Sequence, residues 1–573
     1  MASMIPGAQE AAAERPATVG GMLALASADA IALTFEHQTL TYAQLREQVA
    51  RMAGGLHGQG LRAGDVLGIW LPNTPRWLIL HLACASLGVA TLSLNLKLGV
   101  KELVSFIDRS QCKALAFDRG IANAHAPAGN APPGDGAGFL EGNSLAQVWQ
   151  QHAGSLQLIV DASVHAGGAD APGWPALAQQ MPAAPHRAPG WIRWEALAAA
   201  PMASMDGDPA TLARSACIIL SSSGTTSMPK LIVHSQSNVA LHSQDAAAGF
   251  AIDGGSATLL ALPMCGAFGY CATMATLAAG ARLTMHEAFH PAQAADALRQ
   301  QAITHMFGTN DMVDKMIAPL PADWRPRALR FFGHANFVPG LDELPARAQQ
   351  LGIPMVGCFG MSEILALFAH QDPAAPLERR AQAGGFPITP GAEVRARLVE
   401  TGALAAPMEP GELEFRGPNM MREYLGNPEA TAQAFTGDGF LRSGDLGYVN
   451  GDGGFTHVSR LGDVLRIGGF LVNPAEIEEA VLNASGAGAC QVVAVNAAGS
   501  SRPVAFVIPD AGKAVDESAV KARLQQQIAR YKVPIRIFAV DAFPCTTGPN
   551  GTKVKRNELR ELAQSLLAQE ASK

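Results

Sequence analysis

The sequence lacks an excess of basic residues and is poor in charge altogether. Lysine and arginine number 42 against 49 acidic residues, which gives a formal net charge of −7. This balance provides no positive field for nucleic acid, so a nucleic-acid partner is not expected. Charged residues make up 16% of the chain, against about 25% in average soluble proteins, and hydrophobic residues make up 48%. A chain of this composition is globular.

Paired cysteines and a secretory leader are also missing. The eight cysteines are scattered, and no Cys-x-x-Cys motif is present. This spacing argues against a disulfide framework and against a zinc site, and it fits a reducing compartment. The first twenty residues contain Glu10, Glu14 and Arg15 without an apolar core, so no signal peptide is visible. We expect a cytoplasmic protein.

Uninterrupted hydrophobic runs of membrane-spanning length are absent too. Two uncharged stretches, 77–94 and 258–281, are long enough to raise the question of a membrane span, but they are broken by Gly88 and by Pro263. Each is better explained as a helix and a strand of a buried core, and no transmembrane segment is predicted.

Helix-like and strand-like segments alternate from residue 40 onward. A helical pattern at 40–61 precedes a strand at 66–71, and strands at 89–94 and 114–117 follow with helices between them. This βαβ rhythm predicts parallel sheets covered by helices. At 573 residues the chain is too long for one core. Residues 119–200 are rich in Ala, Gly and Pro with one strand candidate at 156–160, and we expect a low-complexity insertion there.

The most informative segment follows a strand at 216–220. Small hydroxyl and glycine residues fill 221–227, and Pro229 and Lys230 come next. Small residues let backbone amides face an anion, and a lysine adds charge, so the segment is typical of a polyphosphate-binding loop. Its spacing differs from that of P-loop NTPases. The alternative is a flexible Ser/Thr-rich linker.

The segment Ser222–Lys230 resembles the phosphate loop of the acyl-adenylate-forming enzymes, which include acyl- and aryl-CoA synthetases, luciferases and nonribosomal adenylation domains. Four further motifs resemble the family's and occur in its order. They are Phe359-Gly360-Met361-Ser362-Glu363, Ser443-Gly444-Asp445-Leu446, Arg460 with Asp463, and the segment from Lys553 to Leu559.

The resemblance implies an α/β fold with two domains. The large N-terminal domain, 1–461, would consist of subdomains with parallel-rich sheets covered by helices, with the insertion near 119–200. A small mobile α+β domain, 462–573, would carry Lys553. The family hinge falls on Gly462, and the loop before Lys553 is longer than is usual in the family.

The family's chemistry joins a carboxylate to the α-phosphate of ATP and then transfers the acyl group to a thiol. By resemblance, Glu363 would bind Mg²⁺, Ser362 would contact the α-phosphate, and Lys553 would contact both reacting groups. The β- and γ-phosphates would be held by Ser222, Ser223, Gly224, Thr225, Thr226 and Lys230.

The remaining nucleotide contacts are also implied by resemblance. Phe359 would lie against adenine, Asp445 would accept hydrogen bonds from the ribose, and Arg460 would contact the ribose or phosphates. Gly469 would keep a path open for the pantetheine of coenzyme A. Gly333, His334 and Ala335 resemble the family's Gly-Gly-Ala turn, which lies against adenine and the acyl group, although His334 replaces a glycine.

The substrate is predicted to be a small-molecule hydrophobic carboxylic acid. Residues 262–269 resemble the family's Leu-Pro-x-x-His stretch, and by this resemblance Gly266 replaces a histidine or aromatic residue beside the carboxylate. No aspartate between 256 and 285 could pair with an amino group. An aliphatic acid and an aryl or alicyclic acid both remain open. Transfer to coenzyme A is the leading expectation. The alternatives are transfer to the phosphopantetheine of a separate carrier protein, and nucleotide binding without turnover. A homodimer, in which a second copy of the chain is a further partner, also remains open.

Overall fold

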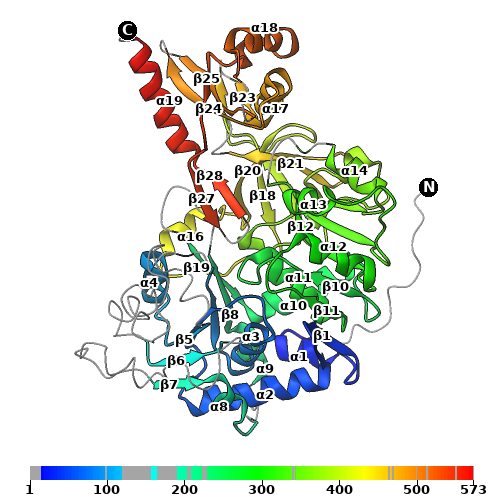
Figure 1. Cartoon of the computed structure of the whole chain (residues 1–573). Helices are drawn as coiled ribbons and strands as arrows, with labels where there is room; N and C mark the ends of the chain where they lie inside the picture. Colours follow the sequence, from blue (N-terminus) through cyan, green and yellow to red (C-terminus); the bar gives the residue numbers. More distant parts are fainter. Residues whose placement is uncertain are drawn as a thin grey trace, which may run out of the picture.

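The computed structural model describes residues 15–96, 98, 100–118, 156–163, 190–202, 208–221, 229–337, 341, 343–461, 465–467, 470–497, 500–510, 514–548 and 551–571. Its strands form two large sheets and three small ones, with helices packed on them (Figure 1). The predicted α/β class is confirmed.

The smaller of the two large sheets has eight strands. The strands from β8 to β7 are parallel, and β8 and β9 are antiparallel, so the residues between them connect two neighbouring strands. Every residue of β3, β4, β5 and β6 is buried, as expected for parallel strands covered on both faces. In spatial order the strands are β19 (Glu423–Tyr424), β9 (Leu231–Ser235), β8 (Ala216–Ser221), β4 (Ala90–Ser93), β3 (Val66–Trp70), β5 (Ala114–Phe117), β6 (Leu158–Asp161) and β7 (Gly190–Arg193).

The larger sheet has thirteen strands. Its middle, from β14 to β1, is parallel, and its β17-to-β15 side is antiparallel. In spatial order the strands are β17 (Glu393–Arg397), β18 (Gly411–Arg416), β20 (Leu441–Val449), β21 (Phe455–Arg460), β16 (Gly384–Pro387), β15 (Ala369–His370), β14 (Met355–Phe359), β13 (Phe331–Ala335), β12 (His305–Thr309), β10 (Ala257–Leu260), β11 (Arg282–Met285), β1 (Ile31–Phe35) and β2 (Gln38–Thr41).

Helices lie between the two large sheets. α10 packs on β8 and β9, α11 packs on β10 and β11, and the two helices pack on each other. The predicted helix at 40–61 is confirmed as α2, which begins with a capping box between Thr41 and Gln44. The helices of this part are α1 (Val19–Ala24), α2 (Tyr42–Gly58), α3 (Pro75–Leu87), α4 (Val100–Arg109), α8 (Trp194–Ala198), α9 (Pro209–Arg214), α10 (Gln236–Gly249), α11 (Ala267–Ala278), α12 (Pro291–Gln300), α13 (Asn310–Ile317), α14 (Leu344–Gln350), the 3₁₀ turn η1 (Ser362–Ile364), α15 (Leu377–Arg380) and α16 (Pro428–Ala434).

The two uncharged stretches form buried core elements. The stretch 77–94 is most of α3 followed by β4, and Gly88, with a φ of 70°, ends the helix between them. The stretch 258–281 is β10 followed by α11, whose residues are almost all buried. Within the described ranges, no helix combines the length and the apolar composition needed to cross a bilayer.

Part of the segment 119–200 belongs to the eight-stranded sheet. The strand candidate at 156–160 is confirmed as β6, and β7 continues the sheet in parallel beyond it. α8 follows directly and buries Trp194 and Leu197. Composition did not predict β7 or α8, because a short strand at the edge of a sheet has little periodicity of its own.

The C-terminal part has its own small sheets and hydrophobic clusters. Two clusters contain only residues from Leu465 onward, and the elements around them gather at one end of the molecule (Figure 1). We therefore propose the domain boundary between residues 461 and 462. The elements are β22 (Leu465–Ile467), β23 (Phe470–Val472), α17 (Pro474–Ser485), β24 (Ala489–Ala497), β25 (Ser500–Ile508), α18 (Glu517–Gln527), the 3₁₀ turn η2 (Arg530–Lys532), β26 (Arg536–Ala539), β27 (Cys545–Gly548), β28 (Gly551–Val554) and α19 (Arg556–Ala571).

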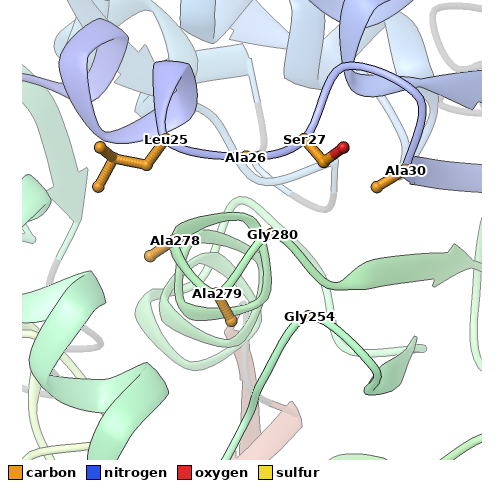
Figure 2. A pocket seen from close by; sticks show the side chains of 8 residues that line it. All are labelled: Leu25, Ala26, Ser27, Ala30, Gly254, Ala278, Ala279 and Gly280. Atoms are coloured by element: carbon orange, nitrogen blue, oxygen red, sulfur yellow. The ribbon is translucent and has the colours of Figure 1, made fainter.

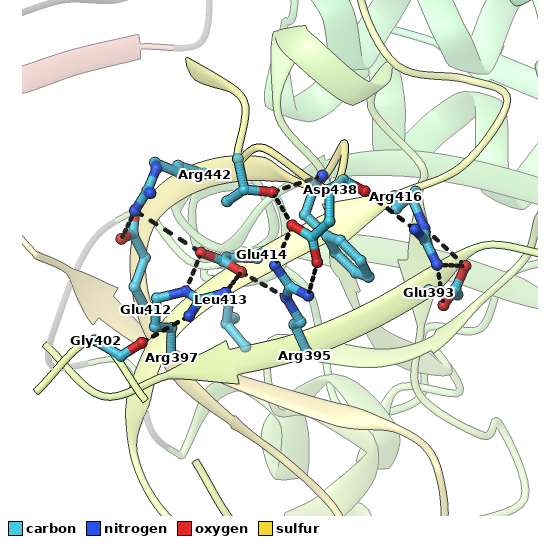
Figure 3. A network of polar contacts seen from close by, with 12 residues as sticks. Glu393, Arg395, Arg397, Gly402, Glu412, Leu413, Glu414, Arg416, Asp438 and Arg442 are labelled. Atoms are coloured by element: carbon cyan, nitrogen blue, oxygen red, sulfur yellow. Dashed lines mark hydrogen bonds and ion pairs between the residues drawn. The ribbon is translucent and has the colours of Figure 1, made fainter. Parts of the chain in front are cut away.

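A buried carboxylate ties together the antiparallel side of the larger sheet. The side chain of Glu414 is fully buried, and its oxygens accept hydrogen bonds from Arg395 at 2.6 Å and from Arg397 at 2.7 Å (Figure 3). Arg395 also pairs with Asp438, which is exposed. Burial opposes ionisation, but the two guanidinium groups outweigh it and hold the pKa of Glu414 below its ordinary 4.5.

We expect Glu414→Gln to lower the free energy of unfolding by about 3 kcal/mol at pH 7. The substitution removes the buried charge that pairs with the guanidinium groups of Arg395 and Arg397. The ion pairs stabilise the fold above the ordinary pKa of 4.5 and are lost as pH falls through the lowered pKa of the folded state. The difference between the two proteins should therefore shrink at acid pH. Urea unfolding at pH 7 and at pH 4 measures both effects.

Glu393→Gln is the matched control, since the pair of Glu393 with Arg416 lies on the same sheet but is about half exposed. This substitution should lower the free energy of unfolding by less than about 1 kcal/mol. Equal losses in the two variants would show that burial does not set the strength of the Glu414 pairs.

Candidate active site

Three parallel strands bring several of the predicted residues to one edge of the larger sheet. β12, β13 and β14 run side by side, with His334 between Gly308 and Gly357 in register. The carboxyl ends of β13 and β14 therefore place Ala335 and Phe359 on the same edge. In an open α/β sheet, this edge is where ligands bind.

Gly333, His334 and Ala335 were expected in a turn, and that expectation is wrong. They are the last three residues of β13. Gly333 and His334 pair with both neighbouring strands, and Ala335 pairs with β12. Glycine is required at 333 because a Cβ there would lie 2.6 Å from the Phe307 ring and 3.0 Å from Cys358 Sγ.

His334 introduces a polar group into this buried strand end. Its side chain is 2% exposed, and Nδ1 lies 3.1 Å from the Asn336 side-chain oxygen. Burial lowers the pKa of His334 to about 4, and the contact with Asn336 opposes this only in part. The imidazole is therefore neutral at pH 7. Its Nε2 is buried, and none of the residues that the structure describes forms a hydrogen bond with it.

Phe359 lies in an aromatic cluster at the junction of β14 with the antiparallel strands. Its ring is 5.1 Å from that of Phe455, 5.3 Å from that of Phe415 and 5.4 Å from that of His457. The residue is 8% exposed. Phe359 thus connects the parallel edge to β18 and β21.

The turn η1 carries Ser362 and Glu363, and its backbone is held from two sides. The Ser362 carbonyl accepts a hydrogen bond from His234 Nε2 at 2.7 Å. The Glu363 carbonyl accepts one from the Met421 amide at 2.6 Å, and the Ile364 carbonyl accepts one from Asn419 Nδ2 at 2.5 Å. Burial lowers the pKa of His234 to about 4, so this histidine is a neutral donor at pH 7.

The carboxylate of Glu363 and the ammonium of Lys230 meet at one side chain, Tyr424. The Tyr424 hydroxyl donates to Glu363 Oε1 at 3.0 Å, and Lys230 Nζ lies 4.4 Å from the centre of the Tyr424 ring. Burial and the Glu363 charge together raise the pKa of the Tyr424 phenol, while the Arg460 charge opposes them. The phenol stays protonated and can donate at any physiological pH.

Asp445 and Arg460 face each other across β20 and β21. Arg460 Nε lies 3.2 Å from Asp445 Oδ1, and Arg460 Nη1 donates to the Ser443 carbonyl at 2.9 Å. His457 Nε2 lies 3.5 Å from the same oxygen of Asp445. Asp445 is 3% exposed, whereas the Arg460 side chain is half exposed.

Several predicted residues lie outside the described residues. They are Ser222, Ser223, Gly224, Thr225 and Thr226 of the predicted phosphate loop, Gly462 at the predicted hinge, and Gly469.

Lys553 lies on β28, which pairs with β27 in a two-stranded antiparallel hairpin. Lys553 is opposite Thr546 in this register. The extra length of the segment before Lys553 is thus taken up by a hairpin, which the sequence reasoning did not predict. The side chain of Lys553 is not among the described parts of the chain.

Sequence reasoning missed Tyr424, His234 and Asn419. Tyr424 contacts the predicted residue Glu363, His234 contacts the predicted residue Ser362, and Asn419 contacts Ile364 in the same turn. His234 reads as a core residue of β9. The signal that could have pointed to Asn419 is the Gly417-Pro418-Asn419 turn just before β19.

A small cavity of about 360 Å³ lies elsewhere on the large domain (Figure 2). Gly254 and Gly280 line it, and they precede β10 and β11, so it lies at the amino ends of these parallel strands. Its lining is of small and apolar residues with one hydroxyl, that of Ser27. Such a lining offers nothing for a nucleotide, and the cavity is not part of the candidate site.

The architecture and the site define a two-part α/β enzyme whose polar groups converge beyond the carboxyl ends of parallel strands. Residues 24–425 match the AMP-binding enzyme family, and residues 476–548 match the C-terminal domain of AMP-binding enzymes. The chain belongs to the AMP-binding enzyme family. The prediction of an AMP-forming acyl-CoA synthetase is confirmed.

The chain resembles curated CoA ligases over most of its length. It is 28% identical to a feruloyl-CoA synthase of Amycolatopsis sp. over 527 residues, 91% of this chain and 93% of the relative. It is 27% identical to an indoleacetate–CoA ligase of Aromatoleum aromaticum over 93% of this chain and 94% of the relative.

Solved structures share the fold. ATP-bound MatB from Rhodopseudomonas palustris superposes with a TM-score of 0.78 at 23% identity, over 96% of this chain and 99% of that one. The O-succinylbenzoate coenzyme A synthetase MenE from Bacillus subtilis, in complex with ATP and magnesium, gives a TM-score of 0.74 at 21% identity, over 95% and 99% of the two chains.

Proposed function

We propose that the protein joins a hydrophobic carboxylic acid to coenzyme A in two steps. In the first step, a carboxylate oxygen attacks the α-phosphorus of ATP, the bond to the β-phosphate oxygen breaks, and pyrophosphate leaves. In the second step, the thiol of coenzyme A attacks the acyl carbon of the adenylate and AMP leaves. We place the reaction in the cytoplasm, because ATP and coenzyme A are both available there.

The observation that carries the proposal is the meeting of Lys230 and Glu363 on Tyr424. The first step brings two anions together and gathers charge on phosphoryl oxygens, so it needs fixed cations and donors. Lys230 ends the predicted phosphate loop, and Glu363 follows β14, at whose carboxyl end we expect the nucleotide. Both residues contact one side chain, which supports their proposed roles as a phosphate-binding cation and a metal-binding carboxylate of one site.

The remaining roles follow the positions of the residues around this point. Asp445 would bind the ribose hydroxyls, with Arg460 beside it. Ser362, next to Glu363, would contact the α-phosphate. Phe359 and the strand end at Gly333, His334 and Ala335 would lie against adenine. We assign the loop residues Ser222, Ser223, Gly224, Thr225 and Thr226 to the β- and γ-phosphates, Gly469 to the pantetheine path, and Lys553 to the α-phosphate and the substrate carboxylate.

Glu363 fits a magnesium ion shared with the nucleotide. Among the residues that the structure describes, no group of three or more His, Cys, Asp or Glu side chains could hold a metal alone. Mg²⁺ is commonly held by one or two carboxylates together with substrate phosphates. One oxygen of Glu363 accepts the Tyr424 hydrogen bond, and such a carboxylate can serve as that single protein ligand. When bound, the ion would neutralise charge on the phosphates.

The acid is assigned by the apolar neighbourhood of Gly266. Gly266 precedes α11, and the side chains of Met264 and Phe268 on either side of it are buried. Related ligases act, by their names, on ring-bearing acids such as indoleacetate. We propose an aryl, alicyclic or longer aliphatic monocarboxylate.

Pyrophosphate release from ATP and Mg²⁺ tests the proposal, with a panel of ferulate, indoleacetate, 2-succinylbenzoate and straight-chain fatty acids. We expect steady release with at least one hydrophobic acid. Adding either coenzyme A or a phosphopantetheinylated carrier protein then identifies the acceptor by which thiol is consumed, and we expect coenzyme A. No release with any acid would refute the proposal. Consumption of the carrier thiol alone would show that the acceptor is the carrier protein and not coenzyme A.

A further inference from the structure

The carboxylate of Glu363 projects from a backbone that is already fixed. Three consecutive carbonyls, those of Ser362, Glu363 and Ile364, each accept a hydrogen bond at 2.7 Å or less, from His234, Met421 and Asn419 respectively. Leu365 follows with a φ of 57°, a conformation that a leucine adopts only when its surroundings hold it. These backbone contacts do not determine the orientation of the Glu363 carboxylate.

Tyr424 sets that orientation. Its hydroxyl donates to Glu363 Oε1 at 3.0 Å, and both residues are more than nine-tenths buried. A hydrogen bond to a charged oxygen is stronger than one between neutral groups, and burial shields it from water. It directs one carboxylate oxygen towards the phenol.

Tyr424 is itself held by the strand that follows the phosphate loop. Tyr424 pairs with Ile232 of β9, and its amide donates to Thr431 Oγ1 at 3.0 Å. On either side of it, the amides of Arg422 and Leu425 donate to β9 carbonyls at 2.8 and 2.7 Å. The phenol therefore keeps a fixed place relative to β9, and with it relative to Lys230.

We propose that Tyr424 is a positioning residue that orients the Glu363 carboxylate towards the metal-nucleotide complex. It also fixes the position of this carboxylate relative to Lys230. The inference rests on the proposed function, in which Glu363 binds Mg²⁺. β9, which follows the phosphate loop, holds Tyr424, and Tyr424 in turn sets the position of the Glu363 carboxylate on η1.

The test compares ATP binding in excess MgCl₂ with ATP binding in EDTA, by isothermal titration calorimetry of the full chain. Tyr424→Phe removes the hydroxyl and keeps the ring against Lys230. It should weaken binding about tenfold in MgCl₂, the loss of one hydrogen bond to a charged group, and leave binding in EDTA unchanged. Tyr424→Leu also removes the ring, so it should weaken binding in both conditions.

Tyr42→Phe is the matched control, because the Tyr42 hydroxyl also donates in the core, to the Ala281 carbonyl at 2.7 Å, away from the candidate site. It should lower the melting temperature and leave both affinities unchanged. Glu363→Gln should abolish most of the difference between MgCl₂ and EDTA.

Two results would overturn the inference, and they are distinguishable. If Glu363→Gln abolishes the magnesium effect but Tyr424→Phe binds ATP as the wild type does in both conditions, Tyr424 does not position Glu363, and the proposed function stands. If Glu363→Gln leaves the magnesium effect intact, the metal assignment of the proposed function fails, and the role of Tyr424 fails with it.

Discussion

Replacement of Lys553 by alanine should slow acyl-adenylate formation by about 10²–10³-fold. The first step places negative charge on the α-phosphoryl group and on the attacking carboxylate, and the lysine is the cation assigned to both. Removing one fixed electrostatic group from a transition state typically costs about this much. Pyrophosphate release with the best acid measures the loss. Thioester formation from a supplied acyl-adenylate should fall far less, because that step occurs after the charge has left with pyrophosphate.

Lys555→Ala is the control for this prediction. Lys555 comes just after β28, and its ammonium pairs with Glu558 at 2.8 Å on an exposed surface. It should leave both steps nearly unchanged. Equal losses of the two steps in Lys553→Ala would refute the role assigned to Lys553, because a general defect of the C-terminal domain affects both.

Replacement of Asp445 by asparagine should raise the KM for ATP by at least about a hundredfold. The Asp445 carboxylate is 3% exposed, and it would accept hydrogen bonds from both ribose hydroxyls. Hydrogen bonds to a charged acceptor contribute about 1.5–3 kcal/mol each, and 1.4 kcal/mol is a factor of ten. The wild type should discriminate strongly against 2′,3′-dideoxy-ATP, whereas the variant should accept ATP and the dideoxy nucleotide almost equally. Initial rates of pyrophosphate release with each nucleotide measure this.

The pairing of Asp445 with Arg460 and His457 offers another explanation for a loss, namely disorder of β20 and β21. In that case both nucleotides would be affected to the same degree, and the ribose assignment would be wrong. Asp452→Asn serves as the control. Asp452 lies in the turn between the same two strands, where it pairs with Arg379 and accepts a hydrogen bond from the Gly454 amide.

The local elements were predictable where the sequence pattern and the packing agree. The helix at 40–61 and the strand at 114–117 appear as α2 and β5, because an apolar face at the right period has only one way to be buried. β7 and the hairpin of β27 and β28 were not predictable. These strands are short and get their regularity from a neighbouring strand.

The candidate site was predictable as a set of residue types but not as a set of contacts. Glu363, Asp445 and Lys230 were found from motifs, and the structure brings Glu363 and Lys230 together. Tyr424 and His234 were missed, because a lone tyrosine or histidine in a strand looks the same whether it faces the core or a functional turn. The turn expected at Gly333–Ala335 is the end of a strand, because β12 pairs with all three residues and β14 pairs with the first two.

The order of motifs along the chain, by itself, determined the chemistry: a phosphate loop, an acidic residue after an aromatic strand end, an aspartate after a glycine and a distant lysine. These are local features, since each depends on a few adjacent residues. Only the tertiary structure decided which of them touch. The order of strands in the two sheets and their register place β9 beside β19, and so place Tyr424 between Lys230 and Glu363. Pairing between strands far apart in sequence depends on how the whole chain packs, and no local pattern records it.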